Sequence, residues 1–230
     1  MNSNQRLHFV SNNISSNRQL HPAWLRILHW VTFYTLLVMV WSGMLIYWAY
    51  PTYKIGSWSV IPKSWFKVLG LESQLAYGLA YHFNFMWILM AAGVFYLLFS
   101  TLFKNWKNLF PVPSDGKQLW QMGLHSLGLR KEMPIQGKYN PAQKLAYFTT
   151  ILSLALVVAS GWAIYKPARL FWLAEALGGY RNARLIHFGC TLYLVFFFII
   201  HVIQVVRAGW RNFSAMVTGG TSQESPLPKP

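Results

Sequence analysis

The chain has 230 residues, 54% of them hydrophobic, 17% aromatic and 11% charged, and it carries a formal net charge of +15. So basic a chain could bind nucleic acid, but its charges lie between long uncharged runs, and this distribution argues against that function. The single cysteine, Cys190, excludes an intramolecular disulfide and the Cys-x-x-Cys-His attachment of c-type haem.

Four runs free of Asp, Glu, Lys and Arg are each long enough to span a bilayer, which takes roughly 20 residues. They cover residues 27–53, 73–103, 145–165 and 185–206. The helices are expected near 24–49, 78–103, 142–165 and 184–207. The predicted fold is therefore all-α, one integral membrane domain over residues 21–212 that forms a four-helix up-and-down bundle.

The basic residues of the connections predict the orientation of this bundle. If the N-terminus is cytoplasmic, 13 Lys and Arg residues lie on the cytoplasmic side and seven on the other. The positive-inside rule then places both termini in the cytoplasm. We expect disordered cytoplasmic tails at 1–20 and 213–230, and an amphipathic helix at 117–131 on the inner membrane surface.

Four histidines lie within the expected spans: His29, His82, His187 and His201. His187 and His201 are 14 residues apart, so one helix presents both in the same direction, with a rise of roughly 21 Å between them. Depth in the membrane pairs His29 with His201 near the inner face. It pairs His82 with His187 near the outer face. Each pair suits axial ligation of a b-type haem in a bundle core, although a single such histidine is more often a packed residue.

A weak internal repeat relates the two halves of the chain. The pattern Ser-Gly-x-x-Ile-Tyr occurs at 42–47 and again at 160–165. Two such hairpins would be related by an axis along the membrane normal. Gly43 and Gly161 then fall at the level of the outer histidines, where a glycine leaves room for a haem macrocycle. Ordinary packing of small residues between helices is the alternative.

The repeat also predicts where the symmetry breaks. Tyr96 and Tyr147 stand where the repeat would place counterparts of the inner pair of histidines. These tyrosines either line a quinone pocket or belong to the aromatic belts of membrane interfaces. The outer loops, 50–77 and 166–183, are also aromatic, and they form either such a belt or a docking surface for an external partner.

Four basic residues flank the histidines in the sequence. They are Arg26, Lys166, Arg184 and Arg207. They either bind the anionic propionates of haem or are snorkelling charges that set the topology.

Five short sequence motifs of the chain occur together in one known protein family. They are His21-Pro22-x-x-x-Arg26-x-x-His29-Trp30, Ser42-Gly43-x-x-Ile46-Tyr47, Tyr139-Asn140-Pro141, Gly161-x-x-Ile164-x-Lys166-Pro167, and Gly178-Gly179-Tyr180 through His187-Phe188 to His201. Over roughly residues 20–218 the chain resembles the bacterial di-haem cytochrome b superfamily, the membrane subunits of hydrogenases, formate dehydrogenases and thiosulfate reductase. It most resembles the thiosulfate-reductase-type branch.

The resemblance implies that the four histidines ligate two b haems and that the bundle lies in a bacterial inner membrane. It also implies a catalytic partner on the periplasmic side, often a molybdopterin oxidoreductase, and exchange of electrons with the quinone pool near the inner haem. The chain would then be an electron-transfer subunit rather than a complete enzyme.

Two other functions stay open from the sequence. One is a self-contained transmembrane haem reductase. The other, more remote, is a transition-metal transporter, because imidazole also binds zinc or copper. No Asp or Glu lies in any of the four runs, and this counts against a proton-coupled transporter.

Overall fold

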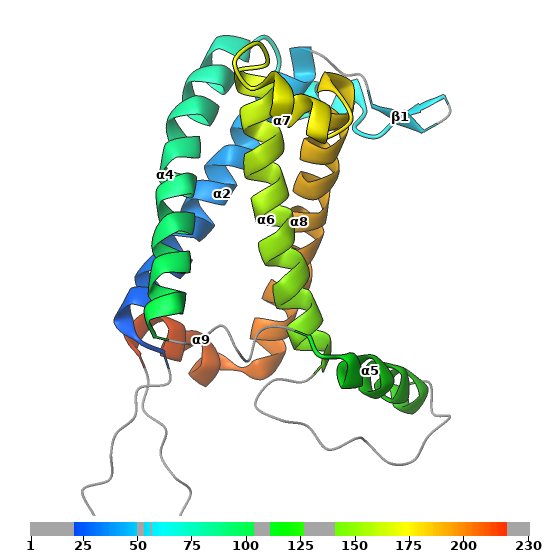
Figure 1. The fold of residues 1–230 in the computed structure, drawn as a ribbon. Helices are drawn as coiled ribbons and strands as arrows, with labels where there is room; N and C mark the ends of the chain where they lie inside the picture. The colour runs from blue at the N-terminus through cyan, green and yellow to red at the C-terminus, as the bar shows by residue number, and fades with distance from the viewer. Residues whose placement is uncertain (1–20, 50–52, 56, 104–110, 127–140, 220–230) are drawn as a thin grey trace, which may run out of the picture.

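Four long helices form the frame of the protein (Figure 1). The structure, a computed structural model, describes residues 21–49, 53–55, 57–103, 111–126 and 141–219. The long helices are α2 (Ala23–Ala49), α4 (Leu75–Leu102), α6 (Pro141–Tyr165) and α8 (Tyr180–Ala208). Among the described residues these four are long and apolar enough to cross a membrane, so the prediction of a helical membrane protein is confirmed. We call the end of the bundle at which α7 lies the upper end, and the opposite end the lower end.

Two of the long helices begin earlier than the sequence predicts. α4 begins at Leu75 rather than near 78, and α8 begins at Tyr180 rather than near 184. For α8 the predicted start follows the edge of the uncharged run at 185, but charge ends a membrane span without ending a helix. Arg181 therefore lies in the first turn of α8, which begins directly after Gly179, whose φ of +93° only glycine adopts readily.

The long helices pair as two hairpins. The backbones of α2 and α4 pack closely along their length, as do those of α6 and α8, while described helices of opposite hairpins approach closely at almost no position. Gly78 of α4 permits the close approach of α4 to α2. A Cβ atom there would lie 2.8 Å from Cβ of Leu45 and 3.1 Å from the carbonyl oxygen of Ser42.

Side chains rather than backbones join the two hairpins. On one side the Trp162 indole of α6 donates a hydrogen bond to Sδ of Met90 on α4 at 2.9 Å, and its ring lies 5.4 Å from that of Trp87. On the other side the rings of Phe33 and Phe198 join α2 to α8 at 5.7 Å. The wider spacing between hairpins is the space into which the histidines project.

The upper end is closed by short elements. They are the antiparallel strands β1 (Lys54–Ile55) and β2 (Trp58–Ser59), and the helices α3 (Lys63–Val68) and α7 (Phe171–Ala176). Phe66 of α3 is fully buried and stacks on Tyr47 at a ring separation of 6.0 Å. Tyr47 stacks in turn on Phe188 of α8 at 5.3 Å. This aromatic stack fixes the upper loop onto the helix that carries His187.

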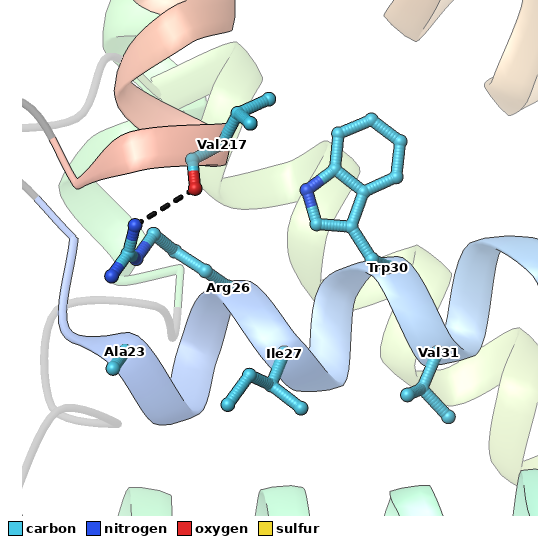
Figure 2. Close-up of a pocket in the computed structure, with 6 residues that line it drawn as sticks. All are labelled: Ala23, Arg26, Ile27, Trp30, Val31 and Val217. Atoms are coloured by element: carbon cyan, nitrogen blue, oxygen red, sulfur yellow. Dashed lines mark hydrogen bonds between the residues drawn. The ribbon is translucent and has the colours of Figure 1, made fainter.

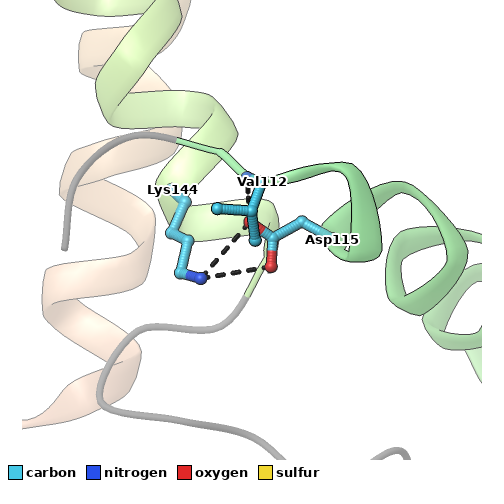
Figure 3. Close-up of polar contacts among 3 residues, drawn as sticks. All are labelled: Val112, Asp115 and Lys144. Carbon is cyan, nitrogen blue, oxygen red and sulfur yellow. Dashed lines mark hydrogen bonds and ion pairs between the residues drawn. The ribbon is translucent and has the colours of Figure 1, made fainter. Parts of the chain in front are cut away.

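At the lower end, α5 (Pro113–Ser126) projects away from the bundle beside α6 (Figure 1). An amphipathic helix was expected at 117–131; it begins earlier, at Pro113, and residues 127–131 lie outside the described part of the chain. Asp115 explains the early start, because its carboxylate accepts a hydrogen bond from the Val112 N–H at 2.8 Å (Figure 3). Lys144 of α6 forms an ion pair with the same carboxylate at 3.1 Å and so ties α5 to the bundle.

The helix α9 (Trp210–Thr218) corrects the predicted C-terminal tail. Residues 213–218 were expected to be disordered, and that prediction is wrong, because they form most of this helix. Gly209, with φ +86° and ψ +168°, ends α8 and turns the chain so that α9 lies across the lower end of the bundle (Figure 1). The remaining parts of the predicted tails, 1–20 and 220–230, lie outside the described residues.

Candidate metal centres

The structure brings the four span histidines together as two pairs. The imidazoles of His82 on α4 and His187 on α8 lie near the upper end, with ring centres 6.1 Å apart and planes at 65°. Those of His29 on α2 and His201 on α8 lie near the lower end, with centres 6.2 Å apart and planes at 61°. Each pair joins one hairpin to the other, and α8 contributes to both.

This spacing fits one metal atom between each pair of rings. A metal–imidazole bond is about 2.0 Å long, and a ring nitrogen lies about 1.1 Å from its ring centre, so two rings that face one metal have centres about 6.2 Å apart. Both pairs meet this distance.

Among the described residues, each site offers two histidine side chains as possible metal ligands. In the described part of the chain, no three His, Cys, Asp or Glu side chains gather as a metal-binding group. A bare zinc or copper ion takes three or four protein ligands, whereas the iron of a haem takes four from its macrocycle and two from the protein. The donor set therefore fits haem iron and does not fit a closed site for a free metal ion.

Hydrogen bonds orient the upper imidazoles. Nδ1 of His82 lies 3.0 Å from Oγ of Ser42. Nδ1 of His187 lies 3.2 Å from Oγ of Ser160 and 3.0 Å from the carbonyl oxygen of Val157. With Nδ1 engaged in this way, Nε2 of each ring is the nitrogen left to bind a metal.

The two glycines of the repeat lie against these imidazoles. A Cβ atom at Gly43 would be 3.6 Å from Cε1 of His82, and one at Gly161 would be 3.2 Å from Cε1 of His187. The sequence suggested that they give room to a macrocycle. In the structure they give room first to the imidazole of their own hairpin, which approaches each glycine edge-on.

The lower imidazoles have an aromatic environment. His201 stacks on Phe197, one turn earlier in α8, at 5.8 Å, and the indole of Trp30 lies edge-on to His29 at 5.5 Å. The Trp30 N–H donates to the carbonyl oxygen of Met216 in α9 at 3.2 Å. The helix α9, which was not expected from the sequence, is thus hydrogen-bonded to α2 at the residue that follows His29.

A groove opens between α2 and α9 at this place. Its volume is about 370 Å³, and its lining residues are Ala23, Arg26, Ile27, Trp30, Val31 and Val217 (Figure 2). One signal for α9 was present in the sequence, because Trp210, Phe213 and Val217 follow the i, i+3, i+7 spacing of one helical face. The tail was expected to be disordered because of its composition, which ends Ser-Pro-Leu-Pro-Lys-Pro, and the composition of 213–230 does not report the helix that ends at Thr218.

The flanking basic residues have different surroundings. Arg26 donates from Nη1 to the carbonyl oxygen of Val217 at 2.8 Å (Figure 2). At the upper end the Lys166 ammonium lies 4.5 Å above the ring of Tyr165, and the Arg184 guanidinium lies 5.9 Å from the ring centre of Tyr53. In both residues the charged group itself lies over an aromatic ring at the upper end of the bundle.

The remaining predicted residues lie away from the groove. Arg207 is in the last turn of α8, at the lower end. Tyr96 of α4 and Tyr147 of α6 are both half-buried, and they belong to opposite hairpins. Neither tyrosine lines the groove between α2 and α9.

Four membrane-length helices with two histidine pairs between two hairpins are the arrangement expected of a membrane haem protein of the cytochrome b type. Comparison with known proteins agrees, because a family model described as prokaryotic cytochrome b561 matches residues 20–219. The chain belongs to this prokaryotic cytochrome b561 family, whose haem is of the b type.

A curated relative is similar over nearly the whole chain. It is the putative protein-methionine-sulfoxide reductase subunit YedZ1 of Azospira oryzae, 32% identical over 201 residues. The matched part covers 87% of this chain and 96% of the relative, so the two have the same extent.

Proposed function

We propose that the chain is a di-haem electron-transfer subunit that carries electrons across the bacterial inner membrane. The electrons pass between quinone in the bilayer and a catalytic redox subunit outside the cytoplasm. The supporting observation is the presence of two imidazole pairs, each spaced for one metal atom, near opposite ends of one bundle. The two proposed ligands on α8 are 14 residues apart, which is a rise of roughly 21 Å along the helix. An electron could therefore pass from one pair to the other on its way across the membrane.

The chain's residues have separate tasks in this proposal. His82 and His187 ligate the upper haem, and His29 and His201 ligate the lower one. The haem supplies the one-electron chemistry when bound. The protein contributes neutral ligands, because Nδ1 of His187 donates to a carbonyl oxygen and its ring is therefore uncharged when Nε2 binds iron. Neutral imidazoles place no permanent charge within lipid.

Basic residues at both ends are proposed to bind the haem propionates. Arg184 and Lys166 do so at the upper end, since each already lies on a ring beside the upper site. Arg207 does so at the lower end. Arg26 stays a candidate as well, although Nη1 is engaged by α9, because its Nε is buried without a hydrogen-bond partner among the described residues.

The orientation of the bundle follows the charge distribution, with both termini in the cytoplasm and the upper end outside. The upper end presents exposed aromatic rings to a partner, among them Trp58 (80% exposed), Trp65 and Phe171. The relative's name includes a reductase, and this supports a catalytic partner for the present chain too. We propose a partner of the molybdopterin type and membership of the thiosulfate-reductase-type branch of the di-haem superfamily.

The groove between α2 and α9 is the site we propose for quinone. It is lined mainly by apolar side chains, it lies beside His29, and the Arg26 guanidinium supplies a hydrogen-bond donor for a quinone carbonyl. Tyr96 and Tyr147 remain a separate proposal for the same ligand.

Filling the groove tests the quinone site. In Val31→Trp we expect reduction of haem by added quinol to slow by roughly tenfold while haem content stays the same, because the indole occupies the groove. Val94→Trp is the matched control, since this valine of α4 is 61% exposed and lies outside the groove. Equal rates of haem reduction in the two variants would show that quinone does not bind in this groove. The variants Tyr96→Phe and Tyr147→Phe would then be measured.

The proposed function as a whole is tested in proteoliposomes. A membrane-soluble quinol is expected to reduce the haem absorption bands, and a membrane-impermeant oxidant added outside is expected to reoxidise them. His201→Leu should abolish reduction by quinol because it removes a ligand of the lower site. Haem that quinol cannot reduce, or that the external oxidant cannot reach, would contradict transfer across the membrane.

A further inference from the structure

The upper imidazoles are held by two matching sets of hydrogen bonds. Ser42 and Ser160 are both fully buried, and each contacts Nδ1 of the histidine on the other helix of its own hairpin. A carbonyl three residues before each serine completes the set. That of Val157 bonds to Nδ1 of His187 at 3.0 Å, and that of Met39 interacts with the His82 imidazole. The sequence repeat thus places a serine hydroxyl and a backbone carbonyl beside each of the two upper imidazoles.

The proton positions follow from what each group can donate. A carbonyl oxygen only accepts, so Nδ1 of His187 carries the proton in its bond to Val157. The Ser160 hydroxyl donates its single proton to the carbonyl oxygens of its own helix, and its oxygen is left to accept from the same Nδ1. Ser42 donates to the carbonyl oxygen of Met39 at 3.1 Å and is placed in the same way toward His82.

The lower imidazoles differ in this respect. Within the described residues, neither the His29 nor the His201 imidazole makes a hydrogen bond, and besides each other they contact the rings of Trp30 and Phe197. A ligand whose Nδ1–H is hydrogen-bonded is more basic at Nε2, and a more basic ligand favours the oxidised metal. The upper pair is therefore the more strongly donating of the two.

We propose that Ser42 and Ser160 are positioning residues that hold the upper imidazoles toward the iron and keep the reduction potential of the upper haem low. This inference rests on the proposed function, because it takes His82 and His187 to be haem ligands. The serines act through the imidazoles and touch no reacting group. The two hairpins each contribute one serine, so the effects of the two are expected to be similar and to add.

Potentiometric titration of the purified full-length protein tests this proposal. In Ser42→Ala and in Ser160→Ala, the midpoint potential of one haem component is expected to shift upward, and the double variant is expected to shift further. The other component should stay at its parent value. The components are assigned with His82→Leu and His201→Leu, which remove a ligand from the upper and lower site, respectively.

Two controls separate this role from general packing. Ser100→Ala removes another buried serine, on α4, which is 7% exposed and is not among the residues that contact the histidines. It should shift neither component. Ser42→Thr and Ser160→Thr keep the hydroxyl, and they should keep the parent potential.

The midpoint potentials of the alanine variants can overturn the proposal. Unshifted potentials in both alanine variants would overturn it, as would a shift of the lower component. If an alanine variant loses the upper haem, the matching threonine variant decides, because retention of haem supports the role of the hydroxyl and equal loss contradicts it. A parent protein without haem would instead overturn the proposed function, so the two failures are distinguishable.

Discussion

Single residues at the upper site show how small side chains position large ones. Ser42 and Gly43 are adjacent, and they present a hydroxyl and an open backbone face to one imidazole. Ser160 and Gly161 do the same for the other. Neither pair would be noticed from its chemistry alone, since serine and glycine are common in membrane helices. Their effect comes from a histidine on the neighbouring helix.

Gly161 and Gly43 are expected to differ in their tolerance of alanine. A Cβ at Gly161 would lie 3.2 Å from the His187 ring, closer than an ordinary contact, and this ring is held by two hydrogen bonds and cannot easily move. Gly161→Ala should therefore lower the haem affinity of the upper site on the order of tenfold. Gly43→Ala, with its contact at 3.6 Å, should change it little. Haem titration of the apoproteins measures both, and equal affinities would contradict this explanation.

Among the short elements, α9 depends on one backbone conformation. Gly209 has φ +86° and ψ +168°, a region that is essentially restricted to glycine and costs other residues about 1–3 kcal/mol. Gly209→Ala should loosen α9 from Arg26 and Trp30 and increase hydrogen exchange of residues 210–218. Gly116→Ala is the control, since that glycine lies within α5 with no heavy atom within 4 Å of the added Cβ. Unchanged exchange in Gly209→Ala would show that the contacts alone hold α9.

The attachment of α5 should depend on pH. The Val112 N–H, followed by the Lys144 ammonium, lowers the pKa of the Asp115 carboxyl below its ordinary value. A carboxyl whose pKa is lowered on folding contributes stability above its unfolded value, near pH 4, and this contribution is lost as the pH falls through the folded value. Protection of the α5 amides should therefore exceed that of Asp115→Asn at pH 6, and the difference should shrink as the pH falls below about 4. A difference that does not shrink on acidification would contradict this role.

At the scale of the whole molecule, two hairpins face each other and α8 carries one histidine of each pair. The four spans and the levels of the histidines were predictable, because helix rise converts sequence separation into depth. The hydrogen bond between Ser42 and His82 could not be predicted, because the depth of a residue does not say which faces of two helices meet. α9 was not predicted either, since nine residues are too few to register as a span.

The most direct test of two bis-histidine haem sites is the haem content of four single variants. The parent protein should hold two b haems per chain. His29→Leu and His201→Leu should each lose the same spectral component, and His82→Leu and His187→Leu should each lose the other. His125→Leu, in α5, should keep both. One haem per chain in the parent, or different components lost from His82→Leu and His187→Leu, would contradict the account.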